Sequence, residues 1–168
     1  MGNSMVDYAK LIKEETGKKG SAISTAEAQW KLEIDLLAFF RNVEIALGEE
    51  MAKANVELKK RAAPTISGPF RPLKDQETIE LSFGTRRPCC RLTLQNKVLN
   101  TRSSAIVVEL FDDLGERMGK AEYAIEAGPG AVRAFRILVE GFPDRSAEIG
   151  TTEIAQEIVS GIIRGRFA

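Results

Sequence analysis

The spacing of apolar residues changes once along this chain, near residue 76. Between Ser24 and Arg61, apolar residues recur every three to four positions, which is the period of an α-helix. From residue 76 onward they alternate with polar residues, as Ile79, Leu81 and Phe83 do, and this is the period of a β-strand. A helical segment followed by a run of strands predicts an α+β fold.

The expected helix has recognisable ends. Ser24 and Glu27 form a capping box, which predicts the first turn, after helix-breaking glycines in the GKKGS stretch (17–21). The AAPTISGP stretch (62–69) ends the helix. We therefore assign residues 1–23 to a flexible tail, 24–62 to a long helix, 63–75 to a linker, and 76–168 to a sheet with a C-terminal helix, with residues 24–168 forming one globular unit.

The expected helix carries two apolar lobes when it is projected at about 100° per residue. The first contains Leu32, Leu36, Phe39, Phe40, Val43, Leu47, Met51 and Leu58. The second contains Trp30, Ile34, Leu37, Ile45 and Val56 beside Ala46 and Ala52. A helix that rests on one surface needs a single apolar stripe, so the second lobe requires a second surface.

Length indicates how much of the helix a sheet can cover. Strands of six to eight residues span about 20–27 Å, whereas a helix of about 35 residues spans roughly 52 Å. One candidate cover for the second lobe is the C-terminal helix. We favour instead the same helix of a second chain, or a helix of a partner protein, because contiguous exposed apolar patches usually mark interfaces. The expected interface residues are Trp30, Ile34, Leu37, Phe40 and Ile45.

Turn segments separate the strand-like stretches, namely GTRRP (84–88), DDLGE (112–116) and GPG (128–130). Asp112 and Asp113 beside Gly115 are typical of a hairpin turn rather than of a metal site. Short connections pair successive strands as antiparallel neighbours, and residues 151–168 return to helical spacing. The predicted fold is therefore α+β, with the long N-terminal helix packed on a five-stranded antiparallel meander and a C-terminal helix. The alternative is a β-sandwich with an appended helical arm.

The composition excludes several kinds of catalytic and metal site. The chain has no histidine, which excludes Ser-His-Asp and Cys-His catalysis and histidine-containing zinc sites. Its two cysteines, Cys89 and Cys90, are adjacent in an expected strand, so their side chains point to opposite faces and cannot easily form a disulfide. We predict two reduced, buried thiols, as in a reducing compartment, no metal, no cofactor and no enzymatic activity.

Basic residues are concentrated in the middle of a chain whose net charge is zero. Residues 59–102 contain ten basic and three acidic side chains, a balance that is compatible with a polyanion. Arg86, Arg87 and Arg91 are the candidate polyanion-binding residues. Only Phe70 and Phe83 lie among the basic residues, so no aromatic platform for stacking bases is evident.

The predicted function follows from the second lobe of the helix. We expect a non-catalytic partner-binding or assembly protein that self-associates, as a homodimer, through its long N-terminal helix, or that binds a partner's helix. One alternative is a nucleic-acid or polyanion binder that uses the basic 59–102 segment, and a second is a histidine-free enzyme or small-ligand protein. No apolar run reaches 18 residues and no signal-peptide core is present, so we expect a cytoplasmic protein with no membrane contact.

Overall fold

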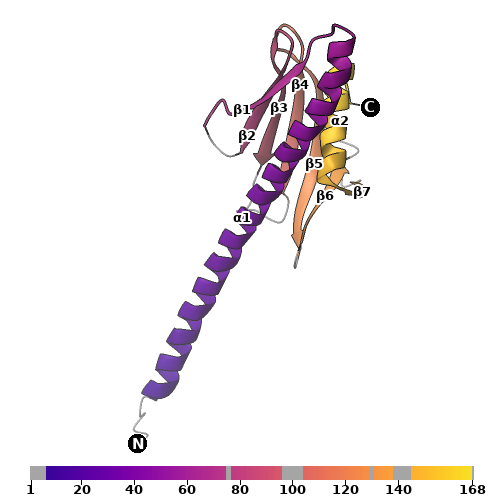
Figure 1. Cartoon of the computed structure of the whole chain (residues 1–168). Coiled ribbons are helices and arrows are strands. Elements are labelled where there is room, and N and C mark those ends of the chain that lie inside the picture. The colour runs from indigo at the N-terminus through magenta and orange to yellow at the C-terminus, as the bar shows by residue number, and fades with distance from the viewer. Residues whose placement is uncertain (1–6, 75–76, 96–103, 129–130, 138–144, 168) are drawn as a thin grey trace, which may run out of the picture. The chain divides into compact units, whose positions relative to one another are not determined.

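The computed structural model describes residues 7–74, 77–95, 104–128, 131–137 and 145–167 (Figure 1). Within these residues the chain begins with helix α1 (Tyr8–Lys60) and ends with helix α2 (Thr151–Arg164). Seven strands lie between the helices: β1 (Ile66–Phe70), β2 (Thr78–Phe83), β3 (Arg86–Gln95), β4 (Ser104–Phe111), β5 (Arg117–Gly128), β6 (Ala131–Ile137) and β7 (Arg145–Ile149). The predicted α+β class and the C-terminal helix are confirmed.

The strands form one curled sheet in the order β1-β2-β3-β4-β5-β6-β7, each antiparallel to the next. This is the meander that the short turns predict, but the predicted number of five strands is wrong. Strand β1 lies in the segment that was assigned to a linker. It was missed because Gly68 and Pro69 interrupt the alternation of apolar and polar residues. Strand β7 was missed because it is short and mostly polar. All seven strands belong to one sheet, so the β-sandwich alternative is wrong as well.

Helix α1 begins earlier than the sequence predicts. Asp7 caps it, because its Oδ1 accepts a hydrogen bond from the Lys10 amide at 3.1 Å and its carbonyl accepts one from the Leu11 amide at 3.1 Å. Residues 8–23, which we expected to form a flexible tail, are therefore helical from Tyr8. Gly17 and Gly20, expected to break the helix, each cost only about 1 kcal/mol relative to alanine, and the helix passes through both.

The chain divides into two compact units, residues 1–34 and residues 35–168. The predicted single unit of residues 24–168 is therefore divided within α1. In the N-terminal unit, four apolar side chains are between 43% and 68% exposed, namely Tyr8, Leu11, Ile12 and Ile34. The hydrophobic core belongs to the C-terminal unit.

The core lies on one face of the sheet. Alternate strand residues point into it, and Leu92 of β3 pairs with Ile79 of β2 and with Val108 of β4. Both helices cover this face in Figure 1. Helix α1 buries Leu36, Phe40, Val43, Leu47 and Met51, and α2 buries Ile154, Ala155, Ile158, Val159 and Ile162. These five residues of α1 all belong to the first apolar lobe predicted for the long helix, so the central part of that lobe enters the core.

The chain turns back sharply after α2. Gly165 has φ 73°, a left-handed conformation that favours glycine, and its amide donates to the Gly161 carbonyl at 2.8 Å. The returning segment places the Phe167 ring directly over Gly161. A Cβ atom at Gly161 would lie 2.6 Å from Phe167 Cε1, so any other residue at this point of the helix would force the ring to move. Close packing therefore accounts for a glycine that the helical pattern alone does not explain.

Candidate functional site

The outward side of α1 in the C-terminal unit contains a short stripe of exposed apolar residues, flanked along the helix by the exposed Arg41 and Lys59. Ile45 is 61% exposed and Val56 is 55% exposed, and Gly48 and Ala52 between them are also exposed. Spacings of three, four and four residues place these four on one side of the helix, opposite the stripe that enters the core. We refer to Ile45, Gly48, Ala52 and Val56 as the α1 face.

Gly48 makes no close packing contact with the described residues outside its own helix. It lies in the interior of α1, and a Cβ atom built there would have no heavy-atom neighbour within 4 Å. Glycine at such a position costs about 0.8–1.0 kcal/mol relative to alanine. Among the described residues no close contact at Gly48 compensates for this cost, in contrast to Gly161.

The five residues predicted for the interface separate in the structure. Ile34 and Ile45 are exposed, Leu37 is half-buried, and Phe40 is completely buried in the core. The Trp30 side chain lies outside the described part of the chain. Assigning Phe40 to an interface was therefore wrong, because this ring packs in the core and reaches no surface. Ile45 is the predicted residue that lies on the α1 face.

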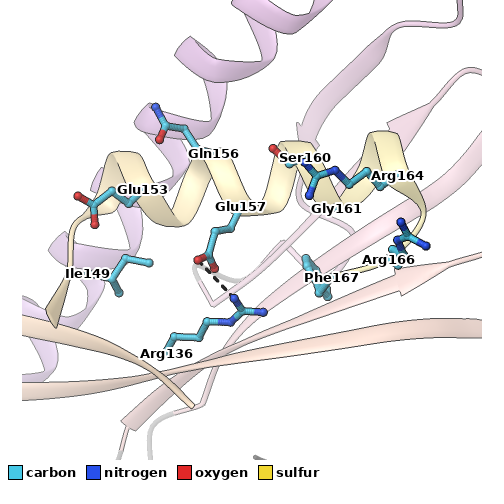
Figure 2. A pocket seen from close by; sticks show the side chains of 10 residues that line it. All are labelled: Arg136, Ile149, Glu153, Gln156, Glu157, Ser160, Gly161, Arg164, Arg166 and Phe167. Atoms are coloured by element: carbon cyan, nitrogen blue, oxygen red, sulfur yellow. Dashed lines mark ion pairs between the residues drawn. The ribbon is translucent and has the colours of Figure 1, made fainter. Parts of the chain in front are cut away.

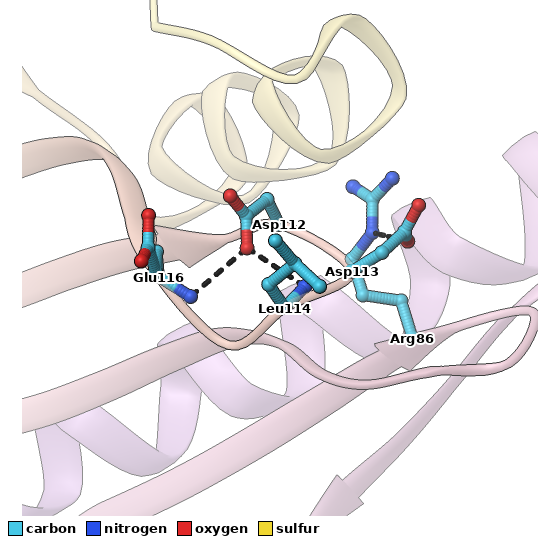
Figure 3. A network of polar contacts seen from close by, with 5 residues as sticks. All are labelled: Arg86, Asp112, Asp113, Leu114 and Glu116. Atoms are coloured by element: carbon cyan, nitrogen blue, oxygen red, sulfur yellow. Dashed lines mark hydrogen bonds and ion pairs between the residues drawn. The ribbon is translucent and has the colours of Figure 1, made fainter.

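Arg86, the first candidate polyanion contact, is paired within the chain. Its Nε donates to Asp113 Oδ1 at 3.0 Å (Figure 3). Asp113 follows Asp112, whose Oδ1 accepts hydrogen bonds from the Leu114 and Glu116 amides, both at 2.9 Å. The hairpin turn predicted for this segment is confirmed, and it holds the carboxylate that neutralises Arg86.

Arg91 and Arg87 are also engaged by neighbouring side chains. Arg91 Nε donates to Glu80 Oε2 at 2.9 Å, and the Arg91 guanidinium lies 5.1 Å from the centre of the Phe111 ring. The Arg87 guanidinium lies 4.5 Å from the centre of the Phe70 ring, at cation–π distance. All three candidate arginines thus have partners inside the chain.

The two cysteines are buried and unpaired, as predicted. Burial raises the pKa of Cys89 to about 11, although the nearby Arg86 charge opposes part of the rise. Burial also raises the pKa of Cys90 well above its ordinary value. Since the thiolate is the reactive form, neither residue has the low pKa of a nucleophilic or redox-sensing cysteine.

A groove of about 440 Å³ runs beside α2 (Figure 2). Most of the residues that line it are polar. They are Arg136, Ile149, Glu153, Gln156, Glu157, Ser160, Gly161, Arg164, Arg166 and Phe167. Its volume falls in the range of roughly 300–1,000 Å³ that is common for small-molecule sites. None of these residues was singled out from the sequence as a binding residue, because β6, β7, α2 and the returning C-terminal segment meet only in the fold.

A buried tyrosine, which does not itself line the groove, is hydrogen-bonded to one member of an ion pair that does. Tyr123 Oη donates a hydrogen bond to Glu157 Oε2 at 2.5 Å, and Glu157 Oε1 lies 3.6 Å from an Arg136 guanidinium nitrogen. Burial, reinforced by the hydrogen bond to Glu157, raises the pKa of Tyr123 far above its ordinary value. At neutral pH Tyr123 is therefore a neutral hydrogen-bond donor.

The described residues contain no group of three or more histidine, cysteine, aspartate or glutamate side chains that could hold a metal ion. No helix within the described ranges is long and apolar enough to cross a membrane. Comparison with protein-family models, with curated proteins and with solved structures found no match to this chain. Function is therefore inferred from the α1 face and the groove themselves.

Proposed function

We propose that this chain is a non-catalytic partner-binding or assembly protein, and that it self-associates as a dimer through the α1 face. The observation that carries the proposal is the exposure of Ile45 and Val56 on the same side of one helix. Burying such side chains against a partner stabilises the complex by about 25 cal/mol per Å² of apolar area. Contiguous apolar surface of this kind is the usual mark of an interface.

Gly48 and the net charge support a second copy of this chain as the partner. Gly48 lies within the apolar face, and a residue without a side chain allows two helices to approach closely. The chain carries 24 basic and 24 acidic residues. Two copies with a net charge of zero are not held apart by long-range repulsion, which favours association.

The polyanion alternative is weaker, because Arg86 and Arg91 form ion pairs and Arg87 lies over an aromatic ring. Phosphates would have to compete with these carboxylates for Arg86 and Arg91. The groove beside α2 is separate from the α1 face. Its polar side chains suit a different kind of ligand from a partner helix.

The experiment that tests the proposal is sedimentation velocity of the full chain over a micromolar concentration series. We expect a monomer–dimer equilibrium in the wild-type chain and a monomer in the variant Ile45→Glu, Val56→Glu. Both side chains are exposed, so the fold should survive their replacement. The matched control is Leu73→Glu, Leu114→Glu, which adds the same charge at two exposed leucines in turns and should still dimerise. A wild-type chain that remains monomeric throughout the series would refute the proposal.

A further inference from the structure

The groove beside α2 contains more positive charge than its own carboxylates neutralise. Three arginines and two glutamates line it. Glu157 is engaged by Tyr123 and Arg136. The second glutamate, Glu153, accepts a hydrogen bond from a backbone amide at the start of α2, at 3.1 Å. Glu157 is therefore paired with an arginine, and Glu153 lies at the N-terminal end of α2, whereas Arg164 and Arg166 follow at its C-terminal end.

Arg164 and Arg166 supply the excess charge. No described carboxylate forms an ion pair with either guanidinium. In Figure 2 both residues lie at the same end of the groove, next to Phe167. The groove is thus polar along its floor and positively charged at the end where an aromatic ring is available.

The backbone fixes the position of this charged end. The Arg166 amide donates to the Gly161 carbonyl at 3.1 Å, immediately after the left-handed cap at Gly165. The next residue, Phe167, is packed against Gly161, and a Cβ atom at Gly119 of β5 would lie 3.7 Å from the same ring. The Arg166 backbone therefore lies between the capping residue Gly165 and the packed residue Phe167.

The negative end of the α2 dipole compensates only part of the positive charge of Arg164 and Arg166. Arg164 lies in the last turn of α2, where a cation complements the negative end of the dipole, equivalent to roughly half an elementary charge. Two guanidiniums exceed that amount. The groove thus keeps a net positive charge at this end, which attracts an anion from outside the described chain.

We propose that this groove binds a small molecule that carries a carboxylate or a phosphate group. Arg164 and Arg166 hold the oxyanion, because planar guanidinium groups donate paired hydrogen bonds to either kind of anion. The Phe167 ring contacts the apolar part of the molecule. Arg136 and Ser160 line the same groove and favour polar substituents on the ligand.

Isothermal titration calorimetry on the full chain tests this assignment, with phenyl phosphate and phenylacetate as probes. Each joins one candidate oxyanion to an aromatic ring, so their relative affinities distinguish phosphate from carboxylate. Benzyl alcohol is the neutral counterpart, and sodium chloride matches the ionic strength. We expect saturable binding of at least one anionic probe and none of benzyl alcohol.

The variant Arg164→Gln, Arg166→Gln should weaken binding at least tenfold. Its control, Lys53→Gln, Arg133→Gln, removes two exposed positive charges outside the groove and should bind as the wild-type chain does. The variant Arg164→Lys, Arg166→Lys keeps the cation at the helix end, which guards against loss of folding, and should still bind severalfold more weakly than wild type. If neither anionic probe binds saturably, or if replacing both arginines leaves the affinity unchanged, the proposal is overturned.

Discussion

Replacing Gly48 by alanine should stabilise the folded chain and weaken its self-association at the same time. The two effects have different origins, so one substitution tests both. Gly48 lies inside α1, is exposed, and has empty space where a Cβ atom would stand. Alanine therefore fits into the single chain without strain.

The stabilising effect comes from helix propensity alone. Alanine is favoured over glycine in a helix interior by about 0.8–1.0 kcal/mol, because glycine loses more backbone freedom on folding. With a slope of about 2 kcal/mol per molar urea, the unfolding midpoint should rise by about 0.4–0.5 M. The measurement is urea unfolding followed by circular dichroism, at a concentration low enough to keep the chain monomeric.

The effect on association has the opposite sign. If two α1 faces meet at Gly48, an added methyl group enters a packed contact, and overpacking typically costs about 1–3 kcal/mol. The dimer dissociation constant measured by sedimentation should rise by about tenfold or more. The matched control is Asn42→Ala, which raises helix propensity by about 0.6 kcal/mol on another side of the same helix. It should stabilise the chain and leave association unchanged.

Two results would refute this reasoning. A stabilised Gly48→Ala chain that dimerises as wild type does would show that Gly48 is not a contact point. A destabilised monomer would show that the local helix geometry at Gly48 does not accept a Cβ atom.

Two further predictions concern buried groups of the core and the groove. Cys90→Ser should lower the free energy of unfolding by about 1–3 kcal/mol, because the substitution buries a hydroxyl group. In the wild-type chain, Cys89 and Cys90 should both react slowly with a thiol reagent at pH 8. Rapid labelling of either cysteine would contradict their burial. Tyr123→Phe should cost about 1.5 kcal/mol, near the low end for a hydrogen bond to a charged group, because the Glu157 side chain is 33% exposed. Because folding raises the Tyr123 pKa, the tyrosine ionises at a lower pH in the unfolded chain than in the folded chain. The stability contributed by the neutral phenol is therefore complete below about pH 10 and is lost as the pH rises above it. Urea unfolding at pH 8 and pH 11 should therefore show a smaller stability difference between the two chains at pH 11, and an unchanged difference would refute this assignment.

Local patterns were enough to predict the fold class. The change of apolar period separated α1 from the sheet, and the Asp112 turn marked the β4–β5 hairpin. Local patterns failed where tertiary context overrides them. Strand β1 contains Gly68 and Pro69, yet it is held through Ile66, whose amide and carbonyl both bond to the Asn55 side chain of α1, at 2.8 and 2.9 Å. No spacing rule anticipates a partner that lies eleven residues earlier on a helix.

The candidate sites were harder to predict than the fold, because they depend even more on contacts between residues that are far apart in the sequence. The projection of α1 separated Phe40 from Ile45, but it placed the buried Ala46 beside the second lobe, and Phe40 was assigned to the interface although it belongs to the first lobe. The arginines were predicted to form a basic surface because their acidic partners cannot be identified from the sequence. Glu80, for example, reaches Arg91 from the neighbouring strand. The groove requires Tyr123, Glu157 and the returning C-terminal segment to meet, and these are far apart in the sequence. The one local sign of the groove was Gly161, a poor helix former inside α2.

The geometry of the α1 face favours an isologous dimer over a contact with an unrelated helix. A two-fold axis passing close to Gly48 would place the glycine of each copy at the crossing point, where two helices come closest. Ile45 and Ala52 of each copy would then flank the crossing, so that a large side chain of one copy meets a small one of the other. A heterologous partner would require its own small residue at the crossing, whereas self-association uses the same glycine twice. The cost of Gly48 in each monomer is thus compensated at the one crossing point that the two copies share, so Gly48→Ala should stabilise the fold and weaken association.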